Sequence, residues 1–141
     1  SFFSALGEDE QKLLLARVIQ MFMPGIPQVW YLDIFAGKNN YEAADNGGSA
    51  GHKEINRTTL TMNDIEQGLK TEVVKKQLEI MHLRNTSAAF SGHIEINDAV
   101  DAVIDIKWVN GTAVAHLKAD LQTNRFTIDH SENGITNTMS F

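Results

Sequence analysis

The stretch Pro24-Gly25-Ile26-Pro27-Gln28-Val29-Trp30-Tyr31-Leu32 marks the place where the chain changes from a helical to an extended pattern. Pro24 ends a preceding helix because proline lacks an amide donor and disfavours helical backbone in the residue before it. Residues 26–32 are nearly all apolar and rich in aromatic and β-branched side chains, as in a strand buried on both faces. The stretch therefore predicts a buried strand over 27–32, and a buried strand after a helix is typical of α/β architecture.

The segments on either side of this strand differ in character. Before it, the acidic residues at 8–10 suit the positive end of a helix dipole, and apolar residues then recur at helical spacing, so a helix is expected over about 8–23. The apolar positions of this helix are Leu14, Val18, Met21 and Phe22. After the strand, residues 33–57 are polar and rich in glycine. They predict a long loop, which in a compact domain is uncommon and usually functional or disordered.

Two further helices are expected after the loop. Thr61 and Asp64 have the spacing of a capping box and open a short helix that ends near Gly68. Thr71 can cap a second helix that continues to about Arg84. The residues expected on its apolar face are Val74, Leu78 and Met81, with Asn85 as a left-handed stop.

The C-terminal part of the sequence has the pattern of a sheet. From about residue 91 apolar and polar side chains alternate, as in an antiparallel sheet with one solvated face. Strands are expected over 93–97, 102–109, 112–121, 125–129 and 135–141. Asn110-Gly111 and Asn133-Gly134 are hairpin signals. The prediction is an antiparallel meander in a small domain of its own, with domain boundaries at 1–90 and 91–141.

The composition excludes several classes of protein. The chain has 12 Lys and Arg against 18 Asp and Glu, a formal charge of −6, which argues against nucleic acid as a partner. It has no cysteine for a disulfide or thiolate site, and a cytoplasmic location is expected. Charged residues and two prolines interrupt the apolar stretch 13–36, so neither a membrane span nor a membrane partner is expected. The chain begins without methionine or a secretory pattern, and we expect it to start inside a longer protein.

The residues alone do not assemble an active site. The five histidines lie too far apart in the sequence for a short metal-ligand spacing, so neither a metal nor another cofactor is expected. Residues 47–53 superficially resemble a phosphate-binding loop, but Ser or Thr does not follow the lysine and no strand precedes the first glycine. A flexible surface loop is expected there instead. The nucleophile pattern Gly-x-Ser-x-Gly is absent.

Residues 25–31 carry a more specific pattern. They resemble the Gly-x-Pro-x-x-Tyr segment at the eighth barrel strand of the alpha-amylase superfamily, glycoside hydrolase family 13. Further phrases are similar to the sucrose phosphorylases of that family: Ser4-Ala5-Leu6-Gly7, Ala36-Gly37-Lys38-Asn39, Glu54-Ile55-Asn56-Arg57, and Arg84-Asn85 followed by Ala88-Ala89-Phe90. The phrases occur in order from Ser1 to about Ile96. The chain thus resembles a C-terminal segment of a sucrose phosphorylase.

The resemblance implies a fold and a reaction. The implied fold is the end of a (β/α)8 barrel, with helix, strand eight, long loop and helix, followed by an antiparallel β domain. The implied parent is a retaining glucosyltransferase that converts sucrose and phosphate to glucose 1-phosphate and fructose by double displacement. Its catalytic carboxylates are expected before Ser1, so this chain alone is expected to be inactive. The remainder of the barrel is the implied partner, and a homodimer is left open.

Arg57 is the one residue of this chain that matches a site residue of the family, because it ends the family-like segment Glu54-Ile55-Asn56-Arg57. The resemblance implies that this arginine helps to close the glucosyl pocket, where a planar guanidinium can hold a carboxylate and still donate to a sugar hydroxyl. The chain departs from the family pattern nearby, with Trp30-Tyr31-Leu32-Asp33 where Tyr-Tyr-Val-Gly is common and Thr58 where histidine is common. The glucoside on which the enzyme acts therefore stays open among sucrose, sucrose 6-phosphate and glucosides of glycerol or glycerate.

A second hypothesis is a non-catalytic module whose terminal sheet binds carbohydrate or contacts another subunit. Trp108 and Phe126 lie on expected strands and could form a platform for a sugar ring. Aromatic residues on alternating strands are more often part of a core, so a core position is favoured for these two rings over a platform.

Overall fold

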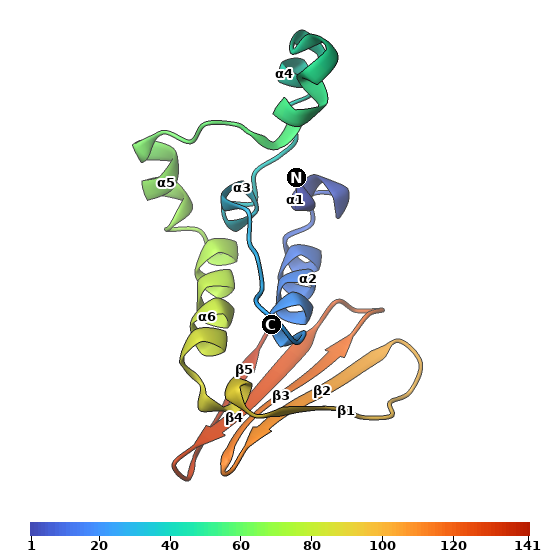
Figure 1. The fold of residues 1–141 in the computed structure, drawn as a ribbon, viewed down its shortest axis with the longest axis vertical. Coiled ribbons are helices and arrows are strands. Elements are labelled where there is room, and N and C mark those ends of the chain that lie inside the picture. The colour runs from blue at the N-terminus through green and yellow to red at the C-terminus, as the bar shows by residue number, and fades with distance from the viewer. The chain divides into compact units, whose positions relative to one another are not determined.

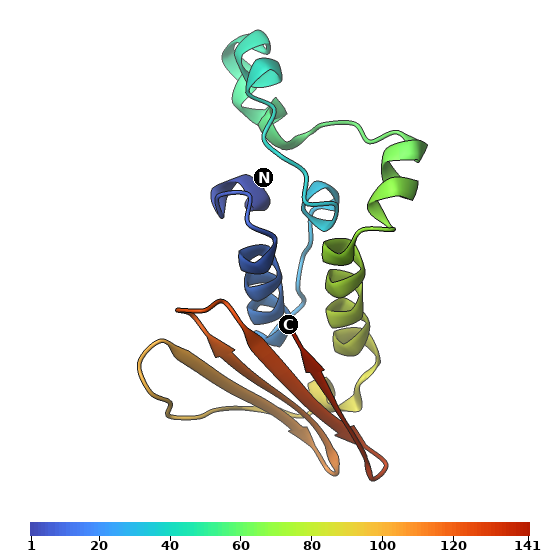
Figure 2. The same cartoon turned by 180° about the vertical axis from the view of Figure 1, so that it is seen from behind.

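A computed structural model describes all residues of the chain, 1–141 (Figures 1 and 2). The chain forms two compact units. The first, here called the helical unit, consists of Ser1–Leu13 and Gln28–Leu78, and the second, the sheet unit, consists of Leu14–Pro27 and Glu79–Phe141. The expected domain boundary at residue 90 stays a prediction.

The helical unit is built from short helices. It contains α1 (Phe2–Ala5), α3 (Tyr31–Ile34), α4 (Tyr41–Asn46), the 3₁₀ helix η1 (Gly48–Asn56) and α5 (Met62–Gly68). It also contains the first residues of α2 (Glu10–Phe22) and of α6 (Glu72–Thr86), whose remaining residues belong to the sheet unit. None of the helices is both long enough and apolar enough to span a membrane.

The sheet unit confirms the predicted meander. After the 3₁₀ helix η2 (Ala88–Ser91), the strands are β1 (His93–Ile96), β2 (Val103–Asn110), β3 (Ala113–Asp120), β4 (Phe126–Glu132) and β5 (Ile135–Ser140). They form one antiparallel sheet in the order β1-β2-β3-β4-β5. In both ribbon views the sheet-unit parts of α2 and α6 lie over the same face of this sheet (Figures 1 and 2).

Two hairpins show how glycine sets the turns. Asn133 and Gly134 both have positive φ, at 52° and 77°, and join Glu132 to Ile135 as in a type I′ turn. In the β2–β3 hairpin the loop is instead Gly111-Thr112, because Asn110 pairs with Ala113 as the last residue of β2. Gly111 has φ 59°, which is the conformation of the first loop residue in a type II′ turn.

Side chains on the sheet alternate as the period-two pattern requires. On β3, Ala113, Ala115, Leu117 and Ala119 are buried, whereas the residues between them face outward. Leu117 and Ile128, neighbours across β3 and β4, are fully buried. Trp108 and Phe126 are only 6% and 3% exposed, so these rings belong to the core, as favoured from the sequence, and do not form a platform for a sugar ring.

Trp108 connects the sheet to the end of α2. Its indole N–H donates to the carbonyl oxygen of Phe22 at 2.8 Å. Its ring lies 5.9 Å from that of Phe90, which in turn meets Phe22 edge to face at 5.2 Å. A buried indole must place its N–H on an acceptor, and here the acceptor is an end carbonyl of a helix.

Arg84 adds a cation to this aromatic cluster. Its guanidinium lies 4.6 Å from the centre of the Phe90 ring and 5.3 Å from that of Trp108. Its Nη2 donates to the carbonyl oxygen of Gly25 at 2.9 Å. Burial lowers the pKa of Arg84. The hydrogen bond from Arg84 to Gly25 fixes the Pro24-Gly25 turn, which lies between the end of α2 and the extended segment.

The structure of this chain does not show the buried strand predicted over 27–32. Residues 26–30 are extended but belong to no sheet, and Tyr31 already begins α3. Ile26 is 99% exposed. A strand needs neighbouring backbone to satisfy its N–H and C=O groups, and no segment of this chain pairs with residues 26–30. The structure therefore does not show the end of a barrel.

The long loop predicted over 33–57 is wrong, because α4, η1 and the end of α3 lie within it. Its glycines serve close packing. A Cβ at Gly51 would lie 1.9 Å from the carbonyl oxygen of Ala44, and one at Gly47 would lie 2.5 Å from the Cα of Gly51. Only glycine lets α4 and η1 approach this closely.

The later helices agree in part with their predicted patterns. The capping box of α5 is present, with Thr61 and Asp64 bonding each other's backbone N–H groups. The predicted apolar face of α6 is confirmed at Val74, but Leu78 is 39% exposed, and the other buried positions are Val73, Gln77, Ile80 and Leu83. Asn85 is likewise no left-handed stop, because α6 continues to Thr86.

Replacing the fully buried Leu117 by alanine should lower the free energy of unfolding by about 2–5 kcal/mol, because the side chain leaves a cavity in the sheet core. Urea unfolding followed by tryptophan fluorescence measures the change. Lys118→Ala, at the neighbouring outward position, is the matched control and should change stability by no more than about 0.5 kcal/mol. Equal effects of the two substitutions would contradict the observed face of β3.

The outer face of the sheet carries an acidic group that makes stability depend on pH. Asp105 Oδ1 accepts a hydrogen bond from Asn97 at 2.8 Å and lies 2.6 Å from His116 Nε2. Burial raises the pKa of Asp105. The hydrogen bonds from Asn97 and His116, together with the charges of His116 and Lys118, lower it by more than burial raises it. The pKa of Asp105 is therefore below its usual value. A lowered pKa in the folded state contributes stability above the ordinary carboxyl pKa, and this contribution is lost as the pH falls through the folded pKa.

Asp105→Asn should therefore lower the free energy of unfolding near pH 7, and the difference from the unaltered protein should shrink as the pH falls below about 4. Chemical unfolding at a series of pH values checks this. Asp98→Asn, at an exposed position of the β1–β2 loop, provides the control. A difference that stays constant from pH 7 to pH 2 would show that the Asp105 charge is not involved.

Candidate functional site

The candidate site is the segment 54–58, at the end of η1 in the helical unit. Four hydrogen bonds hold its backbone, each accepted by the carbonyl oxygen of a different residue. Glu54 O accepts from Arg57 N at 3.2 Å, and Ile55 O accepts from Asn40 N at 2.7 Å. Asn56 O accepts from the indole N–H of Trp30 at 2.8 Å, and Thr58 O accepts from the hydroxyl of Tyr31 at 2.7 Å. The backbone on both sides of Arg57 is thus fixed.

Arg57 itself has a side chain that is available to a ligand. The side chain of Arg57 is 52% exposed, and its Nη1 lies 3.5 Å from Oε1 of Glu54, whose side chain is 48% exposed. An exposed ion pair at this distance contributes little free energy and is readily exchanged for another partner. The segment therefore presents a planar cation from a backbone that is already ordered.

The donors to this segment form an aromatic pair. The rings of Trp30 and Tyr31 lie 4.9 Å apart at an angle of 51°. Their exposed fractions are 43% and 37%, so each ring is in part accessible although its polar atom is in use. Half-exposed aromatic rings next to a few polar groups are typical components of a small-molecule site.

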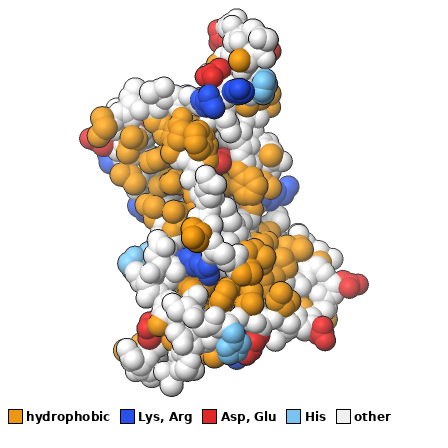
Figure 3. Space-filling view, viewed as in Figure 1, with side chains coloured by type: hydrophobic (Ala, Val, Ile, Leu, Met, Phe, Trp, Pro, Cys, Tyr) orange, Lys and Arg blue, Asp and Glu red, His pale blue; other side chains and the backbone are white.

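The surrounding charges are mixed. Figure 3 shows Lys, Arg and His side chains gathered at the base of the lobe that α4 and η1 form. Asp33, the first acid after the aromatic pair, is only 8% exposed and accepts a hydrogen bond from the backbone N–H of Phe2 at 2.7 Å. Asp33 therefore stabilises the fold of the helical unit and is not presented to a ligand.

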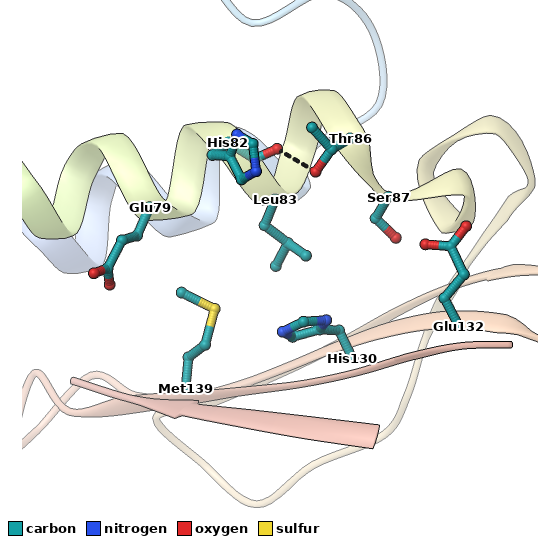
Figure 4. A pocket seen from close by; sticks show the side chains of 8 residues that line it. All are labelled: Glu79, His82, Leu83, Thr86, Ser87, His130, Glu132 and Met139. Atoms are coloured by element: carbon teal, nitrogen blue, oxygen red, sulfur yellow. Dashed lines mark hydrogen bonds between the residues drawn. The ribbon is translucent and has the colours of Figure 1, made fainter. Parts of the chain in front are cut away.

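A separate cavity of about 300 Å³ lies within the sheet unit (Figure 4). Its walls come from α6, with Glu79 and Leu83, and from β4 and β5, with His130, Glu132 and Met139. It contains none of the residues that the sequence analysis selected. No group of three or more His, Cys, Asp or Glu side chains in the chain is placed to hold a metal ion.

The structure thus places the predicted site residue and adds two others. It does not test the role of Arg57, which stays a prediction. Trp30 and Tyr31 were expected as residues of a buried strand and as part of the segment that resembles the family, and their function as hydrogen-bond donors was missed. One signal was present: aromatic residues with a polar atom, in an apolar stretch, usually bring that atom to a partner.

Comparison with known proteins gives the context of this site. The chain is 53% identical to the sucrose 6(F)-phosphate phosphorylase of Ilumatobacter coccineus, with a match over 100% of the chain and 27% of that protein. It is 37% identical to the sucrose phosphorylase of Streptococcus mutans and 35% identical to the glucosylglycerol phosphorylase of Marinobacter adhaerens. Each of these two matches covers 96% of the chain and 29% or 28% of the relative, respectively. No protein-family model matches the chain.

A solved structure gives the same result. The crystal structure of sucrose 6F-phosphate phosphorylase from Thermoanaerobacter thermosaccharolyticum matches with a TM-score of 0.92 at 35% identity. The match covers 100% of this chain and 28% of that one. The five-stranded sheet with its helices corresponds to the C-terminal part of the enzyme. The chain is therefore homologous over its whole length to the sucrose phosphorylases, including those named for sucrose 6(F)-phosphate, and spans just over a quarter of the length of these relatives, 27% in the first comparison.

Proposed function

We propose that this chain is part of a phosphorylase that transfers a glucosyl group from sucrose or a closely related glucoside to inorganic phosphate. The observation that carries this proposal is the match over the whole chain, at 53% identity, to a sucrose 6(F)-phosphate phosphorylase. The reaction is the retaining double displacement of glycoside hydrolase family 13, with glucose 1-phosphate and fructose, or fructose 6-phosphate, as products. The catalytic carboxylates belong to a part of the enzyme outside these 141 residues.

The exposed side chain of Ile26 supports this proposal. Ile26 is a large apolar residue that is 99% exposed, on a segment without strand neighbours. Such a segment is suited to pairing with strands of a larger sheet, which would cover the side chain of Ile26. We therefore assign residues 26–30 to barrel strand eight of the complete enzyme.

In this proposal Arg57 forms one side of the glucosyl pocket. Loops that follow barrel strands lie at the C-terminal face, where (β/α)8 enzymes hold their substrates. The guanidinium can hold a carboxylate of the barrel in two-point geometry and donate to a sugar hydroxyl. Because its ion pair with Glu54 is long and exposed, exchanging partners costs little.

The names of the relatives limit the candidate substrates to three glucosides. The relatives are named for sucrose, for sucrose 6(F)-phosphate and for glucosylglycerol. We propose sucrose 6(F)-phosphate as the first substrate to test, because the relative at 53% identity is named for it. Phosphorolysis rates of the full-length enzyme with the three glucosides decide among them.

In the full-length enzyme, Arg57→Ala should lower kcat/KM for the glucosyl donor about tenfold to a hundredfold. A hydrogen bond to a charged group contributes about 1.5–3 kcal/mol, and 1.4 kcal/mol is a factor of ten. The melting temperature should stay unchanged because the side chain is exposed. Lys53→Ala, which removes another cation near the end of η1, is the matched control and should leave kcat/KM unaltered. Unchanged kinetics of Arg57→Ala would remove this arginine from the site.

The isolated 141-residue chain should not release glucose 1-phosphate from any of the three glucosides in the presence of phosphate, because the proposed nucleophile and acid lie outside it. A coupled glucose 1-phosphate assay measures this, with the full-length enzyme as the positive control. Circular dichroism of the same sample confirms that the chain is folded. Phosphate-dependent turnover by the isolated chain would contradict the assignment of the carboxylates.

A further inference from the structure

We propose that Trp30 and Tyr31 are positioning residues for Arg57, whose backbone they hold from both sides through the N–H of one ring and the O–H of the other. The inference rests on the proposed function, in which Arg57 contacts the substrate. Trp30 donates to the carbonyl of the residue before Arg57, and Tyr31 donates to the carbonyl of the residue after it. Two adjacent side chains thus fix two carbonyls that flank one cation.

The segment needs such donors because no regular structure holds it. Arg57 has φ −115° and ψ 26° and follows the last residue of η1, and residues 57–61 belong to no helix or strand. The peptide unit between Asn56 and Arg57 is bonded at both ends, through its C=O to Trp30 and through its N–H to Glu54 O. Rotation of that unit would break both bonds. The direction in which the Arg57 side chain leaves the backbone therefore depends on Trp30.

The donors are themselves held in place. Trp30 is the N-cap residue of α3, and its carbonyl accepts from Asp33 N at 3.1 Å. At the other end of α3, the carbonyl of Ile34 accepts from the side chain of Gln77 at 2.8 Å, and Gln77 is fully buried on α6. Contacts therefore run from a buried position on α6 through α3 and the aromatic pair to the backbone of Arg57.

The hydrogen bonds from Trp30 and Tyr31 are expected to affect the position of Arg57 more than the stability of the fold. Both are exposed, and the rings that make them are 43% and 37% exposed, so water can replace either donor at a small cost in folding free energy. The cost in geometry is larger, because a small displacement of a substrate-binding group lowers the rate strongly. Loss of a donor should thus change kinetics more than stability.

The test uses the full-length enzyme with Tyr31→Phe and Trp30→Phe, each of which removes a donor and keeps an aromatic ring. Each substitution should lower kcat/KM for the glucosyl donor about threefold to tenfold, with the melting temperature changed by no more than about 2 °C. Tyr41→Phe is the matched control, since it removes the hydroxyl of an exposed tyrosine elsewhere in the helical unit. It should leave kcat/KM unaltered.

A double-substitution cycle separates this inference from the proposed function. In the Arg57→Ala background, Tyr31→Phe and Trp30→Phe should have no further effect on kcat/KM, because the group that they position is absent. If Arg57→Ala alone has no effect, the proposed function fails. The positioning inference is overturned if Arg57→Ala lowers kcat/KM but the aromatic substitutions do not. It is also overturned if the aromatic substitutions lower kcat/KM by the same factor in the Arg57→Ala background as in the unaltered enzyme. A melting temperature that falls in step with kcat/KM in both aromatic variants would also overturn it, as a purely structural role predicts that result.

Discussion

The indole of Trp108 is the contact on which the sheet unit depends most. Its N–H holds the last turn of α2 through Phe22 O, and its ring contacts both Phe90 and the guanidinium of Arg84. Arg84 in turn holds Gly25 O, so one cluster joins α2, α6, η2, β2 and the turn that ends α2. A buried aromatic cluster that also satisfies polar groups favours one arrangement of these elements over others. The place where the extended segment leaves α2 is set by this cluster.

Patterns within the chain predicted the elements whose partners are also in the chain. The period-two alternation gave five strands in the right order, because each strand finds its neighbour a few residues away. The capping box of Thr61 and Asp64 is local and was likewise predictable. Residues 27–32 have the composition of a buried strand, yet composition cannot supply the backbone groups with which such a strand would pair. The buried face of α6 was misjudged because Gln77, a polar residue, occupies it through a bond to Ile34 O.

The candidate site was predicted in part. The motif that ends in Arg57 indicated which residue to examine, but spacing alone could not show what holds it. The bonds from Trp30 and Tyr31 join residues 26 and 27 positions apart, and only a folded chain brings them together. Glycines at 47 and 51 invited comparison with a phosphate loop, whereas they allow two short helices to pack against each other. The same residue types thus have different functions in different backbones.

The bond between Asn40 N and Ile55 O has a consequence for how related chains can vary. The bond joins the two ends of the segment 40–55, which contains α4 and most of η1. This segment is therefore anchored two residues before Arg57. The entropy of closing a flexible loop grows only slowly with length, by about 0.6 kcal/mol for each doubling. Insertions and deletions between Asn40 and Ile55 can therefore accumulate in evolution, or be introduced by protein engineers to alter access to the site. The hydrogen bond between Asn40 N and Ile55 O keeps Arg57 in place meanwhile.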